Sequence, residues 1–575
     1  MRATFLPKKS FVKNTGDFSF FVNDNGVIST EGIPTCSCLT SNLKLFLNGV
    51  IYNKSENQLI QEFDEKGIGM VEELEGNFIL FVSIKTEFYI VTDKVNSKKA
   101  FYAHLDDGWY ISNNINLLPK QRCAVSQEGL ACFLANGVML NTLTLYKEII
   151  SARGGSIYTF QNQQLSLRAY WEYGFDYTTE IPTADSVLKL EKELEKLLIE
   201  SVKEMAPAVS HAAVSLSAGY DIRGILGIIK KHTNLSDLAC FSYASNGNTK
   251  EHSDSFLAKK IAEACCHTHE IMPFYNGDLV GHILGNAKQG KVLTNFCDEL
   301  ETWNSLVKRN TYTDLIVGEE CFGYFNVPLE SKEKLFSLMA INGAGSLRWL
   351  ENFIDPALYH QFNNDLINLQ NKIWARLDKF SDVHDKKDYL YFDQRINHVL
   401  LPWRENICSN VGYVHNPLMH SKILEFIKKL PPVHRQNKNL YKRTISKMLP
   451  ELFEIGFATT SGYSINWELE IRKNKTKLID FVERTDSLLD AIIPKEEIIK
   501  MIKKQSSFFQ IASKNITRVI LYFRKNNKLF NTVVTPFFGQ LSGPLSSKFV
   551  FLDFLVIRLI IIRTELQQDN DTYSK

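Results

Sequence analysis

Several features that would assign this chain to a familiar class are missing from its sequence. The ten cysteines are scattered, and neither the CSC run at 36–38 nor the CC pair at 265–266 has the CxxC spacing of a zinc or redox site. We therefore expect mostly buried thiols in a reducing compartment. The formal net charge is only +2, which gives no reason to expect a nucleic acid or an anionic membrane as partner.

Long apolar runs are also scarce. No apolar segment follows the early charge of Arg2, so the N-terminus does not have the pattern of a signal peptide. The most apolar run, residues 549–562, is interrupted by Asp553 and Arg558 and is too short to span a bilayer easily. A buried or docking helix is expected there, with membrane or partner contact as the alternative. We predict no transmembrane segment and a cytoplasmic location.

The chain has 575 residues, more than one hydrophobic core usually supports, so two or three domains are expected. Most of the first 170 residues alternate apolar and polar side chains around Gly, Asn and Asp turns, which is typical of short strands. A polar stretch follows, and its Ser186 is expected to cap a helix. Strands and helices then alternate, which predicts a parallel, doubly wound sheet, before a largely helical remainder. The predicted domains are residues 1–175, 186–465 and 466–575.

Residues 212–231 are the most informative stretch. An apolar run typical of a buried strand is followed by a turn of small residues, and an apolar helix pattern begins after Asp221. A strand, a tight turn and a helix can cradle a phosphate, because the turn amides and the helix N-terminus point to one place. Asp221 would then lie where it can bind Mg²⁺. No Gly-Lys-Ser/Thr closes the turn, so it is not a Walker A loop, and an ordinary strand–turn–helix joint is the alternative.

The turn resembles the pyrophosphate-binding loop of the ATP pyrophosphatases, whose usual form is Ser-Gly-Gly-x-Asp-Ser. Ser217, Gly219 and Asp221 match that form, while Ala218 replaces its first Gly. Ile222 replaces the final Ser and so removes a hydroxyl that would have bonded phosphate.

The N-terminal region adds four short motifs in a fixed order. Residues 47–53 resemble Phe-Asn-Gly-Glu-Ile-Tyr-Asn, and residues 74–78 resemble Leu-x-Gly-x-Phe. Residues 93–102 and 111–113 resemble Arg-Asp-x-x-Gly-x-Lys-Pro-Leu-Tyr and Ala-Ser-Glu. Together with the turn, these motifs make residues 40–460 similar to the asparagine synthetase family. The resemblance implies an α+β, Ntn-hydrolase-like domain of stacked antiparallel sheets. An α/β, doubly wound parallel-sheet ATP-pyrophosphatase domain and a helical C-terminal extension would follow it.

The first domain of this family is normally a glutaminase whose nucleophile is a cysteine at position 2. Arg2 stands there in this chain, and Cys36 and Cys38 cannot become a chain terminus without cleavage. Acyl transfer from glutamine needs a thiolate beside a base, so we predict that glutaminase activity is absent. Asn48 and Gly49 match the oxyanion-hole residues of the family and are expected to be structural remnants.

The acidic run at 318–324 resembles the signature Gly-Glu-Gly-x-Asp-Glu-x-Phe-Gly-Gly-Tyr in shortened form. Two adjacent carboxylates at the end of a strand are costly unless a cation or an amine neutralises them. The resemblance implies that this turn holds Mg²⁺-pyrophosphate and the attacking amine. We assign Glu319 to catalysis, and Glu320 to the metal with Asp221, although the shortening leaves open which acid binds the metal. Two solvated turn acids are the alternative.

Other residues of the synthetase region are carried over by position. The segment 241–243 corresponds to the strand that contacts the nucleotide in this family, and Asp254 corresponds to the acid at the start of the next helix. His269 corresponds to a histidine motif of the family, and a histidine at a helix end or in the core is the alternative interpretation. The predicted nucleotide- and pyrophosphate-binding set is Ser215, Leu216, Ser217, Ala218, Gly219, Tyr220, Asp221, Ser242 and Gly318.

A basic segment near the end of this region supplies the expected catalytic cation. Lys442, within residues 439–443, matches the lysine motif of the family and would face the α-phosphate or the leaving pyrophosphate, with Arg443 and Lys447 as competitors. Tyr413 and His415 stand where the family has Glu and Arg, which puts the usual contacts to the acceptor substrate in doubt.

The resemblance implies an ATP- and Mg²⁺-dependent ligase that adenylates a carboxylate and transfers the acyl group to an amine. The carboxylate would belong to a small molecule or a peptide, and the amine would be ammonia or part of a substrate. A lactam or macrolactam cyclase is a special form of this activity, and a catalytically inactive nucleotide-binding scaffold is the alternative from another class. A pathway protein partner and a homodimer stay open.

Overall fold

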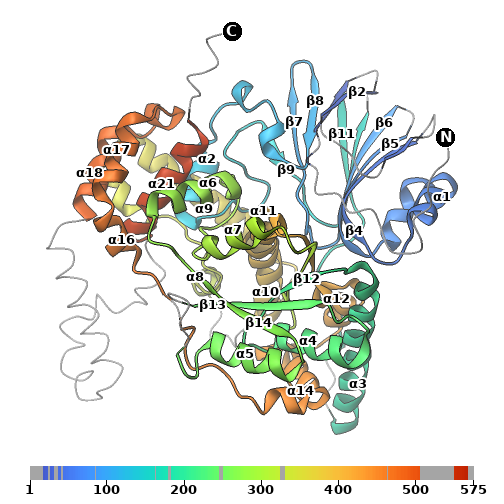
Figure 1. Cartoon of the computed structure of the whole chain (residues 1–575). Helices are drawn as coiled ribbons and strands as arrows, with labels where there is room; N and C mark the ends of the chain where they lie inside the picture. The colour runs from blue at the N-terminus through green and yellow to red at the C-terminus, as the bar shows by residue number, and fades with distance from the viewer. Residues whose placement is uncertain are drawn as a thin grey trace.

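The computed structural model describes residues 17, 19–23, 26–31, 37–39, 43–84, 86–161, 163–178, 183–244, 250–323, 331–462, 464–505 and 550–567. Arg2 and Cys36 lie outside these residues. Figure 1 shows antiparallel strands in the N-terminal part, a parallel sheet in the middle of the molecule, and a group of helices formed by the last part of the chain.

The N-terminal region contains two antiparallel sheets that pack face to face. Phe20 and Trp109 of one sheet share a core with Phe81 and Phe160 of the other. The first sheet has the strand order β2-β1-β8-β7-β9 and the second has the order β11-β10-β6-β5-β4-β3. Their strands are β1 Ser19–Asn23, β2 Gly26–Glu31, β3 Ser37–Leu39, β4 Leu43–Ile51, β5 Gly76–Ile84, β6 Glu87–Thr92, β7 Phe101–Leu105, β8 Gly108–Ser112, β9 Ile149–Ser151, β10 Ser156–Gln161 and β11 Gln164–Ala169. The expectation of stacked antiparallel sheets is confirmed.

The second region is built on a parallel sheet with the strand order β14-β13-β12-β15-β16. Ala212 and Val214 of β12 face one core, and Ala213 between them faces another, so both faces of the sheet are covered. The strands are β12 Ala212–Ser215, β13 Leu238–Ala244, β14 Thr268–Pro273, β15 Asp314–Ile316 and β16 Tyr413–His415. The chain runs outward through β13 and β14 and then returns to the other side of β12. The sheet therefore has its topological switch point between β12 and β15, where ligands of such sheets bind.

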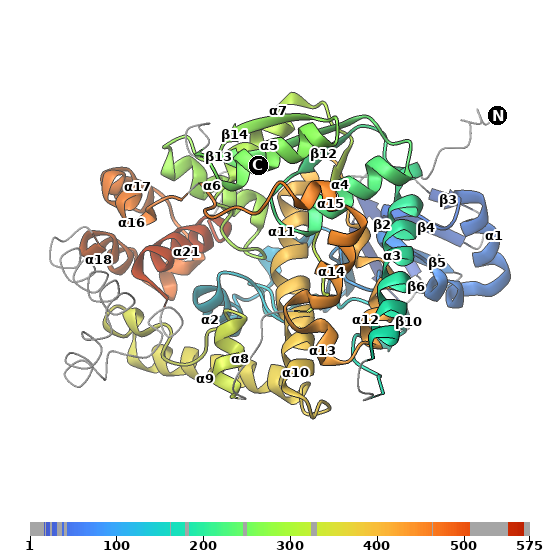
Figure 2. The same ribbon diagram turned by 90° about the horizontal axis from the view of Figure 1, so that it is seen from below.

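Helices surround this sheet and form most of the remaining described residues. Figure 2 shows α14 beside α3, and α3 in turn contacts α4. The helices of the chain include α1 Glu56–Lys66, α2 Gln127–Asn136, α3 Ala184–Met205, α4 Asp221–His232, α5 Asp254–Ala264, α6 Leu279–Gly290, α7 Leu300–Arg309, α9 Pro356–Ala375, α10 Val383–Leu390, the π-helix η7 Tyr391–Leu400, α11 Leu401–Asn406 and α14 Asn439–Met448. Thr183, rather than the predicted Ser186, caps α3, because the helix begins at Ala184 and Ser186 takes the third position of a capping box.

The C-terminal apolar run forms the buried helix α21, Leu552–Glu565. It is apolar on all sides, which is typical of a helix inside a core. It packs against α6, α2 and α18 (Lys495–Gln505), so segments far apart in the sequence share one core. Among the described residues no helix is long and apolar enough to cross a membrane.

Candidate functional site

Two turns meet at the switch point of the parallel sheet. The turn after β12 leads through Ser217 into α4, and the turn after β15 carries Glu319 and Glu320. They approach so closely that a Cβ on Gly318 would lie 3.1 Å from the backbone nitrogen of Ile222. A residue without a side chain is favoured at this crossing, since anything larger would push the acidic turn away from α4.

The acids of the two turns converge on the ammonium group of Lys438. Its Nζ lies 3.0 Å from Oδ2 of Asp221 and 2.7 Å from Oε1 of Glu320. Burial raises the pKa of Glu320 to about 7 and also raises the pKa of Asp221, although Lys438 opposes both shifts. The other oxygen of Asp221, Oδ1, is buried without a hydrogen-bond partner in the described part of the chain. The two carboxylates thus share one cation position, which the ammonium group of Lys438 occupies, and their assignment to a metal ion stays a prediction.

Lys438 was not among the residues selected from the sequence. It lies directly before α14 in a left-handed backbone conformation with φ 59°, and Asn437 before it has φ 53°. Two successive left-handed residues turn the chain sharply, so Lys438 does not continue the register of the helix that carries Lys442. The available signal was its position in the same basic segment, four residues before Lys442.

The structure gives Lys442 different neighbours from Arg443 and Lys447, the other two candidates for the catalytic cation. The Nζ of Lys442 lies 5.4 Å from the centre of the Tyr220 ring in the turn, and its charge is among those that oppose the raised pKa of Asp221. Arg443 and Lys447 instead form ion pairs with Glu191 of α3, at 2.8 and 2.6 Å. Lys442 is therefore the one of the three beside the predicted phosphate turn.

Hydrogen bonds within the protein hold this turn closed. The amide of Ala218 donates to Oδ1 of Asp254 at 2.9 Å, and the amide of Gly219 donates to Oγ of Ser217 at 3.4 Å. The buried guanidinium of Arg223 donates to the carbonyl of Ala218 at 2.6 Å. Two of the amides that were expected to face a phosphate are thus bonded to side chains.

The predicted polar residues of the neighbouring strands are also paired. Ser242 donates its hydroxyl proton to the carbonyl of Leu216 at 2.6 Å and lies 2.9 Å from Nε2 of His269. Burial lowers the pKa of His269 to about 4, so its ring is neutral near pH 7. The hydroxyl of Ser215 lies 3.1 Å from that of Tyr243. These bonds fix the exit of β12 against β13.

Glu319, the first acid of the turn, points away from Lys438 and pairs with Arg404 of α11. Its Oε1 lies 2.8 Å from Nε and 2.7 Å from a terminal nitrogen of Arg404. Both side chains are mostly buried, and within the described residues Oε2 of Glu319 has no partner. The two adjacent acids therefore have separate cations, Lys438 for Glu320 and Arg404 for Glu319.

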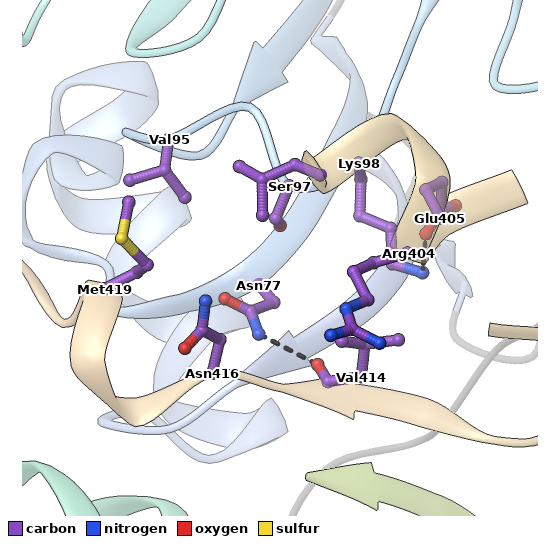
Figure 3. Close-up of a pocket in the computed structure, with 10 residues that line it drawn as sticks. Asn77, Val95, Ser97, Lys98, Arg404, Glu405, Val414, Asn416 and Met419 are labelled. Atoms are coloured by element: carbon purple, nitrogen blue, oxygen red, sulfur yellow. Dashed lines mark hydrogen bonds and ion pairs between the residues drawn. The ribbon is translucent and has the colours of Figure 1, made fainter. Parts of the chain in front are cut away.

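Arg404 also borders a small cavity between the N-terminal sheets and the region of the parallel sheet. Figure 3 shows Asn77 and Lys98 from one side facing Arg404, Glu405 and Asn416 from the other. Lys98 pairs with Glu405 at 2.7 Å, and Asn77 donates to the carbonyl of Val414 at 2.8 Å. The volume is about 10 Å³, which is close to the room that one water molecule needs.

Tyr413 and His415 are part of strand β16 and are buried, so they do not line an open acceptor site. His415 places Nε2 2.9 Å from Oδ1 of Asp314 and Nδ1 3.1 Å from the hydroxyl of Tyr52. This chain of polar groups connects the parallel sheet with the N-terminal region. Glycine at position 49 is required by the structure, because its φ is +114° and a Cβ there would lie 2.1 Å from the carbonyl oxygen of Asn77.

The carboxylates of Asp221 and Glu320 fit a magnesium ion whose remaining coordination positions are taken by a bound ligand and water. The described residues contain no group of three or more His, Cys, Asp or Glu side chains placed to hold a metal. Asp221 and Glu320 offer two carboxylates to one position, and Oδ1 of Asp221 is unpartnered. Mg²⁺ is commonly bound by one or two carboxylates together with phosphate oxygens and water.

Comparisons with known proteins agree with part of this description. No protein-family model matches the chain. A protein of Methanocaldococcus jannaschii described as a putative glutamine-hydrolysing asparagine synthetase is 24% identical over 204 residues, which are 34% of this chain and 38% of that protein. The chain thus matches well under half the length of this curated relative.

Two solved structures show only distant similarity. A glutamine phosphoribosylpyrophosphate amidotransferase of Bacillus subtilis is 9% identical, with 45% of this chain and 85% of that chain covered, at a TM-score of 0.20. A tRNA thiolase of Methanococcus maripaludis is 10% identical, with 55% and 79% covered, at a TM-score of 0.22. At these TM-scores the two structures add nothing to the assignment of the site.

Proposed function

We propose that this protein is an ATP-dependent, AMP-forming ligase that joins a carboxylate to an amine, as asparagine synthetases do. The observation that supports it is the convergence of Asp221 and Glu320 on one cation position at the switch point of a parallel sheet. The acids come from different turns, so their meeting is a property of the fold and not of one local motif. The partial identity with an asparagine synthetase favours this chemistry among the uses of such a sheet.

Asp221 and Glu320 would hold Mg²⁺, which neutralises charge on the pyrophosphate that leaves the nucleotide. Lys438 must then leave its present position, because its ammonium group already lies between the two carboxylates. The phosphate oxygens of a bound nucleotide would be suitable partners for the released ammonium. Lys438 would therefore change from a counter-ion of the protein to a counter-ion of the ligand.

The remaining residues position the reaction. A substrate carboxylate oxygen attacks the α-phosphorus of ATP, and the bond to pyrophosphate breaks. An amine then attacks the acyl carbon, AMP leaves with the bonding electron pair, and the amine nitrogen loses a proton as the amide forms. The turn from Ser215 to Asp221, with Ser242 and Gly318, would border the nucleotide, and Lys442 would stabilise charge on the phosphates. Glu319, fixed by Arg404, is assigned to the amine because its Oε2 is unpartnered within the described residues.

The sequence leaves the amine as ammonia or as part of a substrate, which includes an internal amine that would close a lactam. The prediction that glutaminase activity is absent stays part of this proposal, so glutamine is not proposed as the nitrogen source. The predicted domain boundaries, the cytoplasmic location and a homodimer remain part of this proposal as predictions.

A nucleotide-binding scaffold without catalysis is the second candidate. The observation in its favour is that the protein itself supplies partners for the groups of the site. Lys438 neutralises Asp221 and Glu320, and the amides of Ala218 and Gly219 donate hydrogen bonds to side chains. Ile222 in place of a phosphate-binding Ser points the same way. A protein that never needs Mg²⁺ could keep this arrangement permanently.

ATP–[³²P]pyrophosphate exchange with a panel of carboxylic acids separates the two candidates. A ligase is expected to give exchange that depends on Mg²⁺ and on one class of acid. The absence of exchange with every acid, in a folded sample that binds ATP, would favour the scaffold. If exchange occurs, product analysis with ammonia, glutamine and substrate amines identifies the nitrogen donor.

A further inference from the structure

A second, larger cavity lies between the N-terminal sheets and the helices that follow α9. Its volume is about 510 Å³, which is within the range of small-molecule sites. One wall comes from residues 94–96, 153–156 and 167–173, and the other from α10, η7 and the end of α9. None of its lining residues belongs to the turn at 215–221 or to the acidic turn at 318–320.

Positive charge dominates the walls of this cavity. Lys94, Arg153, Arg376 and Lys379 line it, against only Glu172 and Asp393. Asp393 is already paired with Arg376 at 2.8 Å, and Nε of Arg376 is buried without a hydrogen-bond partner in the described residues. Within the part of the chain that the structure describes, no acid lies in ion-pair distance of Arg153 or Lys379. The cavity therefore presents cations that its own walls do not neutralise.

His398, which also lines the cavity, responds to this charge. Burial lowers its pKa well below the usual value, and the positive charges of Lys99, Arg376 and Arg153 lower it further. The imidazole is thus neutral near pH 7 and does not add to the positive charge, but it can donate or accept one hydrogen bond.

Aromatic rings form the apolar part of the wall. Tyr173 and Phe392 are stacked with their centroids 4.1 Å apart, and the Trp171 ring lies 5.9 Å from Phe392. The ammonium of Lys379 lies 4.6 Å from the centre of the Tyr389 ring. Flat apolar surface beside cations is the combination that binds an organic anion with an apolar body.

Asn96 supplies an acceptor that the protein does not use. Its side chain is 2% exposed, and its Nδ2 donates to the carbonyl of Ala152 at 3.2 Å, which fixes the orientation of the amide. Its Oδ1 is buried and has no partner among the described residues. A buried acceptor without a donor is costly, so a ligand that donates a hydrogen bond here would be favoured.

We propose that this cavity is a binding site for a small organic anion. Its acid group, a carboxylate or a phosphate, faces Arg153 and Lys379. Its apolar body lies on Trp171 and Phe392, and a donor on that body bonds Oδ1 of Asn96. This site is separate from the nucleotide site and does not depend on the proposed ligase activity.

Isothermal titration of the full chain tests the site with aromatic probes that differ in charge. Indole-3-acetate and phenyl phosphate carry an anionic group as a carboxylate or a phosphate, indole-3-acetamide is neutral, and tryptamine is a cation. At least one of the two anions is expected to bind at millimolar concentration or below, and the amide and tryptamine much more weakly.

Variants locate the binding. The double variant Arg153→Gln/Lys379→Gln is expected to weaken binding of the anion by about tenfold or more, which corresponds to about 1.4 kcal/mol. The matched control Lys192→Gln removes an exposed charge on α3, and Lys438→Gln removes a cation from the nucleotide site, so both should bind the anion as the parent does. The proposal is overturned if neither anion binds to the folded protein. It is also overturned if acid and amide bind equally, or if Lys438→Gln abolishes binding and the double variant does not.

Discussion

Replacement of Lys438 by Gln is the perturbation that tests the site most directly. In the parent protein, a divalent cation must displace the ammonium group from Asp221 and Glu320 before it can bind. In Lys438→Gln that competitor is gone, and two carboxylates face each other without a cation. We therefore predict that the variant binds a divalent metal more tightly than the parent in the absence of nucleotide.

The structure sets the size of the effect. The ammonium lies 3.0 and 2.7 Å from the two carboxylate oxygens, and each contact at such a distance gives roughly 5–6 kcal/mol of attraction at an effective dielectric constant of about 20. Desolvation offsets most of this, and removal of one partner from a buried ion pair costs about 3–5 kcal/mol. The side chain of Lys438 is 22% exposed, and the pKa of Glu320 is raised to about 7. We therefore take the net stabilisation of the two acids by Lys438 as about 2–3 kcal/mol at pH 8. A metal that recovers this energy gains roughly 30- to 150-fold in affinity.

Titration of Mn²⁺ followed by electron paramagnetic resonance measures that affinity without nucleotide, since Mn²⁺ shares the preference of Mg²⁺ for carboxylate oxygens. The matched control is Lys442→Gln, one turn later on α14, which should change the affinity by less than about threefold because it forms no close pair with the acids. Addition of Asp221→Asn to Lys438→Gln should abolish the gain. Unchanged or weaker Mn²⁺ binding by a folded Lys438→Gln protein would refute a shared metal position.

Four further outcomes follow from the geometry. Asp221→Asn should lower ATP–pyrophosphate exchange by at least about 10²-fold, because one metal ligand is lost, and exchange at the parental rate would contradict its role. Arg404→Gln should destabilise the protein by about 3 kcal/mol in urea unfolding, since it leaves Glu319 buried and unpaired, and adding Glu319→Gln should recover most of the loss. Burial, and then Glu299, raise the pKa of Asp298 from 3.8 to about 7, so the folded state binds more protons. Its contribution to stability is full below pH 4 and lost as the pH rises through 7, and Asp298→Asn should flatten unfolding measurements across that range. Gly323→Ala should lower the free energy of unfolding by about 3 kcal/mol or more. Its φ is +117°, which costs about 1–3 kcal/mol for a residue with a side chain, and a Cβ would also lie 1.8 Å from the carbonyl oxygen of Arg435.

The sequence was sufficient for features that depend on local pattern and on sheet geometry. Uninterrupted apolar runs identified β12 and β13, and alternation identified the antiparallel strands of the N-terminal region. Because parallel strands end at one edge of a sheet, the order of the strands was enough to place the turn at Asp221 beside the acids at 319–320. The helix formed by residues 552–565 could be predicted as buried, because its apolar residues have no polar face.

Features that depend on contacts between distant segments could not be predicted. The ammonium of Lys438 reaches the acids only because Asn437 and Lys438 adopt left-handed conformations, and neither residue type demands that. Strand β16 is only three residues long, so the sequence showed only that His415 replaces a residue type that the family uses at the acceptor site, and it did not reveal that the partners of His415 are Asp314 and Tyr52. Likewise, Ser242 could not be recognised as a structural hydroxyl until Leu216 and His269 were placed beside it.

Lys438 explains why the identities of the site residues alone do not separate a ligase from a scaffold. Two buried carboxyl groups can both stay ionised only beside a cation, so an enzyme that binds Mg²⁺ only with its nucleotide would need another cation when it is empty. In the proposed ligase, Lys438 would supply this cation with a flexible, single-charged side chain, which a divalent ion bound to a nucleotide would displace. A permanent scaffold would gain nothing from a replaceable cation, and an apolar pair would serve it at least as well. The charge at the site is therefore better explained by exchange between two cations than by structural support, and the affinity of Lys438→Gln for Mn²⁺ measures that exchange.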